Sequence, residues 1–245
     1  MASIKQGDCL ELMKEIPDKS IDMILCDLPY GTTACKWDSV IPFEPLWEQY
    51  NRIIKDNGAI VLFGSEPFST VLRMSNLKNY KYDWIWCKTK PSGFLNCKKQ
   101  PMRKQENISV FYKKQCIYNP QDLILKDKQN KNSCKENTYG KVREFTQEVT
   151  YTNYPHNVLE YANIVGSNCL HPTQKPVALL EYLIKTYTNE GETVLDNCMG
   201  SGSTGVACIN TNRDFIGYEL NEEYFNIAQN RLREAWKEKH KNKAT

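Results

Sequence analysis

Apolar residues along this chain alternate between short unbroken runs and stretches in which they recur every three or four positions. Residues 21–26 form a run with one polar side chain that ends before Asp27, which is typical of a buried strand. Residues 43–54 place apolar side chains at helical spacing, and Asp-Asn-Gly at 56–58 predicts the end of that helix. Residues 59–63 form a second unbroken run. Strand, helix and strand in this order predict a right-handed crossover between parallel strands.

The same alternation returns toward the C-terminus. Pro176 suits the first position of a helix, and Thr193–Asp196 is a predicted strand. A helical stretch then extends to about Asn210, residues 215–219 form another predicted strand, and Asn221 caps a last amphipathic helix. The chain therefore predicts an α/β fold with a mostly parallel central sheet and helices on both faces.

The middle of the chain has a different pattern. Residues 82–87 and 108–112 are predicted strands of a more antiparallel edge. From Lys113 to Val165 the periodicity weakens, and Asn, Lys, Gln, Thr and Tyr dominate. Because ~50 residues are too many for an ordinary loop, we expect an inserted segment there.

Composition places the chain among ordinary globular proteins. Of its 245 residues, 40% are hydrophobic and 25% are charged, and no run approaches the ~18 to 20 apolar residues that a membrane span requires. The N-terminus has no apolar signal region, so a cytoplasmic location is expected. Ten cysteines include no C-x-x-C pair and only three histidines are present, which predicts reduced structural thiols without a metal site or disulfides.

Charge is distributed unevenly along the chain. The net charge is only +3, but residues 97–143 contain twelve Lys or Arg against four acids, so the remaining residues carry about −5. Such asymmetry indicates one face for a polyanion. A solvated basic segment without a partner explains the cluster about equally well.

The first candidate for chemistry is the sequence Asp27-Leu28-Pro29-Tyr30, directly after the first predicted strand. Ligands of open α/β sheets bind at the carboxyl ends of the strands. A carboxylate beside an aromatic ring suits a planar, hydrogen-bonding ligand such as a nucleobase. A strand-end cap and an ordinary partly buried ring are the alternative interpretation.

The second candidate is the glycine turn at residues 196–204, between a predicted strand and a predicted helix. Gly200 and Gly202 permit close backbone approach, and the helix start presents free N–H groups. Glu219 ends the next strand, where an acid accepts hydrogen bonds from ribose hydroxyls. Gly205 is followed by valine rather than lysine, which excludes a phosphate-binding P-loop and favours a nucleoside.

Several motifs together resemble the β class of amino-group DNA methyltransferases, which use S-adenosyl-L-methionine. Residues 27–30 resemble the catalytic Asp-Pro-Pro-Tyr motif of that family, and residues 198–202, Cys-Met-Gly-Ser-Gly, resemble its Phe-x-Gly-x-Gly cofactor motif. His-Pro-Thr-Gln-Lys-Pro at 171–176 is similar to the motif beside the methionine end of the cofactor, and Gly7-Asp8 to an acidic motif near its adenine. The order of the motifs along the chain also matches.

The resemblance implies a Rossmann-like methyltransferase fold with circularly permuted motif order. Residues 1–112 would then be the catalytic half, residues 113–165 an inserted target-recognition region, and residues 166–245 the cofactor-binding half. The implied activity is transfer of a methyl group to the N6 amino group of adenine in a specific sequence of double-stranded DNA after base flipping, by a site-specific adenine methyltransferase.

The resemblance also implies roles for individual residues. The Asp27 carboxylate and the Leu28 carbonyl would accept the two N–H bonds of the target amino group, Pro29 would stiffen the loop and Tyr30 would stack on the flipped base. The implied cofactor contacts are Asp8, Asp27, His171, Thr173, Lys175, Asp196, Asn197, Cys198, Gly200, Ser201, Gly202, Ser203, Thr204, Glu219 and Leu220.

The basic middle segment is then the expected DNA-contacting region, with an affinity that falls steeply as salt rises. The residues expected on DNA are Lys98, Lys99, Arg103, Lys104, Lys113, Lys114, Lys141 and Arg143.

Two departures from the family pattern stand out. Leu28 replaces the first proline of the catalytic motif, which we expect to be harmless because only its carbonyl is used. Asn197-Cys198 replaces the usual Pro-Phe before the glycine turn, which removes an aromatic wall and predicts weaker cofactor binding.

Alternatives to the adenine activity stay open on the sequence alone. Cytosine N4 methylation uses the same chemistry, but the family's cytosine members usually carry Ser where Asp27 stands. An RNA substrate, a catalytically silent DNA-binding subunit and a cofactor-sensing partner of another subunit are the others. We expect a nucleoid-associated enzyme that is either bacterial or phage-encoded. The sequence does not decide between these two origins, nor whether a homodimer or a cognate restriction endonuclease is involved.

Overall fold

The computed structural model describes residues 2–31, 38–132, 147–164, 166 and 170–241. The chain forms two compact units, Met1–Asn119 with Asn157–Thr245, and Pro120–His156. In the smaller unit the antiparallel strands β6 (Ile124–Asn132) and β7 (Gln147–Thr152) pair with each other. This unit lies inside the segment 113–165 that the sequence predicts to be inserted.

The larger unit contains a mixed sheet and the helices of the chain. Its strands are β1 (Ala2–Gln6), β2 (Ile21–Cys26), β3 (Ile54–Gly64), β4 (Tyr80–Ser92), β5 (Arg103–Phe111), β8 (Val158–Tyr161), β9 (Thr193–Asp196) and β10 (Asp214–Glu219). Its helices are α1 (Cys9–Met13), α2 (Phe43–Ile53), α3 (Phe68–Ser75), η1 (Phe94–Asn96), α4 (Val177–Tyr187), α5 (Ser203–Asn210) and α6 (Glu222–Lys241). None of the helices described is long and apolar enough to cross a membrane.

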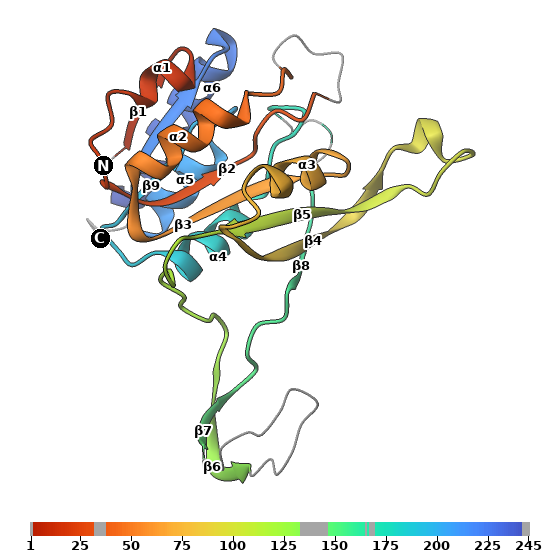
Figure 1. The fold of residues 1–245 in the computed structure, drawn as a ribbon, viewed down its shortest axis with the longest axis vertical. Helices are drawn as coiled ribbons and strands as arrows, with labels where there is room; N and C mark the ends of the chain where they lie inside the picture. The colour runs from red at the N-terminus through yellow and green to blue at the C-terminus, as the bar shows by residue number, and fades with distance from the viewer. Residues whose placement is uncertain (1, 32–37, 133–146, 165, 167–169, 242–245) are drawn as a thin grey trace. The chain divides into compact units, whose positions relative to one another are not determined.

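The sheet has the strand order β1-β10-β9-β2-β3-β5-β4-β8 (Figure 1). Within the described residues, β5 alone runs antiparallel to its neighbours β3 and β4, and every other adjacent pair is parallel. The mostly parallel α/β fold predicted from the sequence is therefore confirmed, and so is the antiparallel pairing of the two middle strands.

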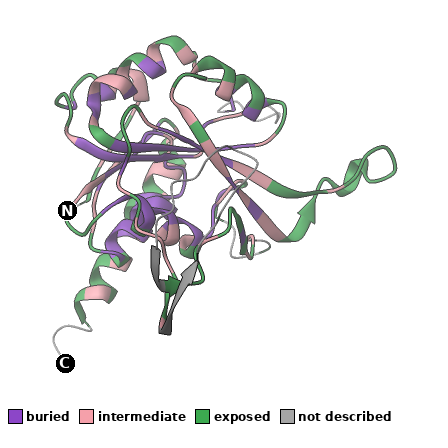
Figure 2. Ribbon diagram, turned by 60° about the horizontal axis from the view of Figure 1, so that its bottom comes forward, coloured by how far each residue is buried: buried purple, intermediate pink, exposed green. Residues whose placement is uncertain are grey.

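The central strands β2 and β9 and residues 59–64 of β3 are buried on both faces, which explains their unbroken apolar runs. In β2, Met23 and Leu25 join a core cluster with residues of α4, α5 and α6, while Ile24 and Cys26 join a second cluster with residues of α1, α2 and α3. Helices thus cover both faces of the sheet. Figure 2 shows the buried residues concentrated in the sheet and on the helix faces that pack against it.

The two central strands, β2 and β9, are parallel neighbours, and the chain continues from them toward opposite sides of the sheet. The chain leaves β2 through α2 to β3 on one side, and leaves β9 through α5 to β10 on the other. The connections therefore diverge at the carboxyl ends of β2 and β9. Such a switch point leaves a crevice, and open α/β sheets bind their ligands in it.

The structure differs from the pattern-based prediction at several elements. Asp56-Asn57-Gly58 does not end the preceding helix, because α2 ends at Ile53 and these residues belong to β3. Gly58 is needed there because a Cβ atom would lie 2.7 Å from the carbonyl oxygen of Asp22 on β2. The sequence did not predict β1, α1, α3 or β8. Strands β1 and β8 are short edge strands; β1 is mostly exposed and β8 has one buried residue, Leu159, so they carry little hydrophobic pattern.

Candidate active site

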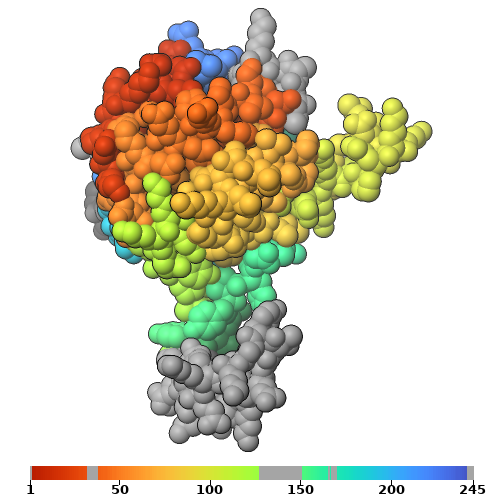
Figure 3. Space-filling view, viewed as in Figure 1, coloured from red at the N-terminus to blue at the C-terminus, as the bar shows by residue number. Residues whose placement is uncertain are grey.

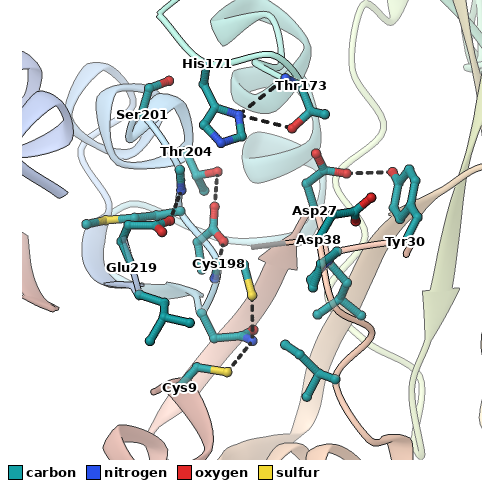
Figure 4. Close-up of a pocket in the computed structure, with 18 of the residues that line it drawn as sticks. Cys9, Asp27, Tyr30, Asp38, His171, Thr173, Cys198, Ser201, Thr204 and Glu219 are labelled. Carbon is teal, nitrogen blue, oxygen red and sulfur yellow. Dashed lines mark hydrogen bonds between the residues drawn. The ribbon is translucent and has the colours of Figure 1, made fainter. Parts of the chain in front are cut away.

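A cavity of about 390 Å³ lies at the carboxyl ends of β2 and β9, within the size range of small-ligand sites (Figure 4). Sequence-predicted residues from both ends of the chain meet in its wall. They are Asp8, Asp27, Leu28, Pro29, Tyr30, His171, Thr173, Lys175, Asp196, Asn197, Cys198, Gly200, Ser201, Ser203, Thr204, Glu219 and Leu220.

Gly202 has a different position from the other predicted cofactor residues. It precedes α5 with φ at 79°, and a Cβ atom on it would lie 3.0 Å from the Cβ of Ala228 on α6. The left-handed backbone and the close helix packing both require glycine. Gly202 therefore shapes the turn that presents the neighbouring residues.

Asp27 is held from two sides at the end of β2. The hydroxyl of Tyr30 donates to its Oδ1 at 2.6 Å, and the ammonium group of Lys175 forms an ion pair with its Oδ2. Burial raises the pKa of Asp27, while the charge of Lys175 lowers it. Burial also opposes the charge on Lys175, but Asp27 and Glu106 outweigh it and raise the pKa of the lysine. Lys175 therefore stays cationic next to the carboxylate.

A second ion pair lies behind Lys175. Its Nζ is 3.5 Å from Oε2 of Glu106 on β5, and Glu106 pairs with Lys88 on β4. Lys175 is 7% exposed, and Glu106 and Lys88 are each 12% exposed, so the pairs are largely shielded from water. Burial raises the pKa of Glu106, but the two lysines outweigh this effect and lower it overall. Four groups of alternating charge thus connect β4 and β5 to Asp27.

The ring of Tyr30 is fixed by aromatic packing. Its centroid is 4.9 Å from that of Phe68 on α3, with the rings stacked at 29°. Gly31 follows with φ at 68°, and its N–H donates to Oδ1 of Asp38 at 2.9 Å. Asp38 also lines the cavity and was not predicted from the sequence. The turn after β2 therefore holds Tyr30 beside Asp27.

The glycine turn is organised by two carboxylates that bind neutral donors. Glu219 accepts the N–H of Gly200 at 2.8 Å on one oxygen and the N–H of Asn221 at 2.8 Å on the other. Asp196 accepts the hydroxyl of Thr204 at 2.6 Å and the N–H of Cys198 at 3.1 Å. Burial raises the pKa of Glu219 and raises that of Asp196 to about 6, against the effect of these hydrogen bonds.

His171 forms the wall of the cavity over the glycine turn. The N–H and the hydroxyl of Thr173 lie 3.3 and 3.1 Å from its Nδ1, and its ring packs edge-on against Tyr224 with centroids 4.2 Å apart. Burial and the nearby charge of Lys175 lower the pKa of His171 to about 4. The imidazole is therefore neutral at physiological pH and acts as a packed, polar wall.

Asn197 and Cys198, which depart from the family motif, are integrated into a polar cluster. The hydroxyl of Tyr50 donates to Oδ1 of Asn197 at 2.5 Å, and Nδ2 of Asn197 lies 3.5 Å from the sulfur atoms of Cys9 and Cys198. The cysteines that the structure describes are free thiols. Cys35, Cys134 and Cys169 lie outside the described residues.

The predicted DNA-contacting residues fall into two groups. Lys98, Lys99, Arg103 and Lys104 lie on or beside the β4–β5 connection, which leaves the sheet at the edge that holds the cavity. Because β5 runs the opposite way, Lys113 and Lys114 follow its end at the other edge, where Lys114 pairs with Asp56 at 2.7 Å. Lys141 and Arg143 lie outside the described residues.

Comparisons with known proteins agree on one kind of enzyme. A family model described as a DNA methylase, N6_N4_Mtase, matches residues 21–230. The chain is 30% identical over 248 residues to the DNA adenine methyltransferase YhdJ of Escherichia coli (strain K12), covering 94% of this chain and 82% of that protein. It is 29% identical over 244 residues to the Type II methyltransferase M.HpaI of Haemophilus parainfluenzae, covering 92% and 72%. The crystal structure of the M1.HpyAVI-SAM complex is similar with a TM-score of 0.66 and 26% identity, covering 95% of this chain and 99% of that one.

Proposed function

The chain belongs to the N6_N4 DNA methylase family, and on that premise we propose that it is a site-specific adenine methyltransferase that modifies double-stranded DNA. The observation that carries the proposal is the position of Asp27, which borders the switch-point cavity together with the glycine turn. One of the related proteins, YhdJ, is named a DNA adenine methyltransferase.

The cavity fits S-adenosyl-L-methionine, the methyl donor of this family. Its size, the carboxylate of Glu219 at the end of β10 and the turn at Gly200 suit a nucleoside, and Asp196 carries no cationic partner among the described residues. Asp8, Asn197 and Glu219 would hold the adenosine part, and residues 171–175 would border the methionine part. When bound, the cofactor supplies an electrophilic methyl group on a cationic sulfur.

The chain's own contribution to catalysis centres on the amino group of the target base. The N6 lone pair of adenine is delocalised into the ring, which makes it a poor nucleophile. If the Asp27 carboxylate and the Leu28 carbonyl each accept one N–H bond, the nitrogen is drawn toward tetrahedral geometry and its lone pair becomes available. The charge of Asp27 also opposes the positive charge that develops on nitrogen.

Lys175 and Tyr30 prepare Asp27 for that role. The lysine favours the ionised carboxylate against the effect of burial, and the hydroxyl of Tyr30 fixes its orientation. Phe68 supports the ring of Tyr30, which offers a surface for stacking of a base taken out of the duplex.

The product nucleoside tests the proposal. Purified protein is incubated with labelled S-adenosylmethionine and either genomic DNA or RNA. The digested nucleic acid is analysed by mass spectrometry, and modified positions in the DNA are mapped. N6-methyladenine in one recurring sequence is the expected result. N4-methylcytosine would assign the cytosine activity of the same family, and transfer to RNA alone would overturn the DNA substrate.

Two partners beyond DNA are also proposals. A homodimer predicts twice the monomer mass in light scattering. A cognate restriction endonuclease predicts that DNA from cells expressing the chain resists one specific cleavage activity. A monomeric mass and unprotected DNA would contradict them.

A further inference from the structure

The β4–β5 ribbon extends well beyond the sheet to which it belongs. Pairing of β3 with β5 ends at Asn107, and pairing of β8 with β4 ends at Lys88. Beyond these points the two strands pair with each other, through Ser92 and Arg103. We call residues 89–105 the arm; it projects from the sheet in Figures 1 and 3, and Figure 2 shows that its outer part is exposed.

The tip of the arm presents apolar side chains to solvent. Gly93 turns the chain with φ at 90°, and the short helix η1 follows. Phe94 is 73% exposed and Leu95 is 96% exposed, so neither contributes to the core. Two adjacent large apolar residues at the end of a projecting hairpin indicate a surface that contacts a partner.

The arm is also strongly basic. It contains Lys90, Lys98, Lys99, Arg103 and Lys104 but no acidic residue. Among the ion pairs of the described residues, none involves these five side chains, whereas Lys88 below the arm is neutralised by Glu106. Apolar tip residues therefore lie beside cations that have no acidic partner among the described residues. This combination matches a polyanion with an apolar interior, such as stacked duplex DNA.

The base of the arm is connected to Asp27 through ion pairs. Glu106 lies directly below the arm on β5, and it contacts the same lysine that pairs with Asp27. Strand β4 runs parallel to β2 and β3, so the arm leaves the carboxyl edge of the sheet where the cavity opens. A duplex that delivers a base to Asp27 would therefore meet the arm, since each extended residue adds ~3.3 Å of reach.

We propose that the arm binds duplex DNA and that Phe94 and Leu95 insert into the base stack beside the target, occupying the space that the flipped base leaves. Lysines and Arg103 of the arm contact phosphates on either side. This inference rests on the proposed function, because it assumes a duplex whose target base must leave the helix. Insertion offsets part of the unstacking cost of flipping.

The double variant Phe94→Ser with Leu95→Ser tests insertion. Its substrates are a duplex containing the mapped recognition site and the same strand with the target base opposite an abasic site, where pairing is already lost. We expect kcat/KM to fall roughly 10- to 100-fold on the paired duplex and by less than about 3-fold on the abasic duplex. Leu77 is an exposed leucine before β4 at the opposite edge of the sheet, so Leu77→Ser should change kcat/KM on neither substrate.

Failure of the insertion and failure of the proposed methyltransferase function give different results in this experiment. If the wild-type protein methylates neither substrate, the proposed function fails. If the wild type is active but the double variant loses equal activity on both substrates, or none on either, insertion is wrong. If the double variant instead lowers the oligomeric mass in light scattering, the tip contacts a second copy of the chain and the DNA assignment is overturned.

The cations of the arm have their own test. Lys98→Ala with Lys99→Ala should weaken duplex binding and make the dependence of log affinity on log salt shallower by about two, since each phosphate contact contributes about 0.9. Lys78 is an exposed lysine just before β4, at the opposite edge of the sheet, so Lys78→Ala should leave the slope unchanged. Equal slopes for wild type and the arm variant would contradict phosphate contacts by the arm.

Discussion

Two carboxylate sites lie side by side at the carboxyl edge of one sheet, Asp27 in one and Asp196 with Glu219 in the other. They differ in whether a cation is paired with the carboxylate. Asp27 after β2 is paired with a lysine, behind which Glu106 and Lys88 continue the alternation of charge. Asp196 and Glu219 are the last residues of β9 and β10. They bind backbone N–H groups and a threonine hydroxyl, without a cation partner among the described residues.

The presence or absence of a paired cation suits two different roles for a carboxylate. A carboxylate that must be ionised to accept hydrogen bonds from a reacting amine benefits from a fixed cation, because burial alone would protonate it. Carboxylates that face a cationic, hydroxyl-bearing ligand would lose their attraction for it if a lysine neutralised them. We therefore propose that Asp27 serves the chemical step and that Asp196 and Glu219 serve cofactor affinity.

The largest effect that would sharpen this comparison is expected at Asp27. Asp27→Ala removes both the acceptor and the opposing charge, so the rate of methyl transfer should fall roughly 1000-fold or more. Asp27 is also among the predicted cofactor contacts, but cofactor affinity, measured by calorimetry, should fall much less than the rate. Circular dichroism and thermal melting show whether the variant is folded, and a folded variant with undiminished transfer would remove Asp27 from the catalytic role.

Glu219 should show the reverse behaviour. Glu219→Gln keeps the shape of the side chain but replaces one carboxylate oxygen by an NH2 group. That group cannot accept the backbone N–H of Gly200 or Asn221 that the oxygen accepts now. Hydrogen bonds to charged groups contribute about 1.5–3 kcal/mol, so affinity for S-adenosylmethionine should fall roughly 10- to 100-fold. The single-turnover rate at saturating cofactor should stay close to that of the wild type; a slow saturated rate would contradict a role in affinity alone.

The charges behind Asp27 should move the pH profile in opposite directions. Activity is present above the pKa of Asp27 and is lost as pH falls through it. Lys175 lowers this pKa and Glu106 raises it, on top of the dominant effect of burial. Lys175→Met should therefore shift the acidic limb of kcat/KM to higher pH, and Glu106→Gln should shift it to lower pH.

A shift of the same sign in both variants would show that the limb reports another group. His171 is not a candidate for it near neutrality, because its pKa is lowered to about 4.

The smallest effect is expected at Leu28. Only its carbonyl is assigned a function, and its side chain is 3% exposed in the core cluster of α1, α2 and α3. Leu28→Pro should keep activity within a factor of about three while lost packing costs about 1–3 kcal/mol of unfolding free energy. A loss of activity as large as that of Asp27→Ala in a folded variant would show that the leucine itself is required.

The sequence predicted the elements whose signal is local. Ile21–Cys26 and Thr193–Asp196 were predicted with the bounds that the structure has, because buried parallel strands form unbroken apolar runs. The residues at their ends line one cavity because parallel strands end at one edge. The individual roles assigned to them stay predictions.

The ion-pair chain and the arm could not be predicted from the sequence in the same way. Glu106 stands in a polar stretch without periodicity, and its burial depends on Lys88 across the ribbon and on Lys175, which comes from the far side of the inserted segment. Lys175 was expected beside the cofactor and lines the cavity, but its ion pair with Asp27 was not predicted. Val158–Tyr161 becomes a strand only by pairing with β4.

The division of labour between the two sites has one direct test. Single-turnover methyl transfer is measured against cofactor concentration for Asp27→Asn and Glu219→Gln, two variants that each replace one carboxylate by its amide. The saturated rate should collapse only in Asp27→Asn, and the half-saturating concentration should rise only in Glu219→Gln. Rates and affinities that fall together in both variants would contradict the separation of catalysis from cofactor binding.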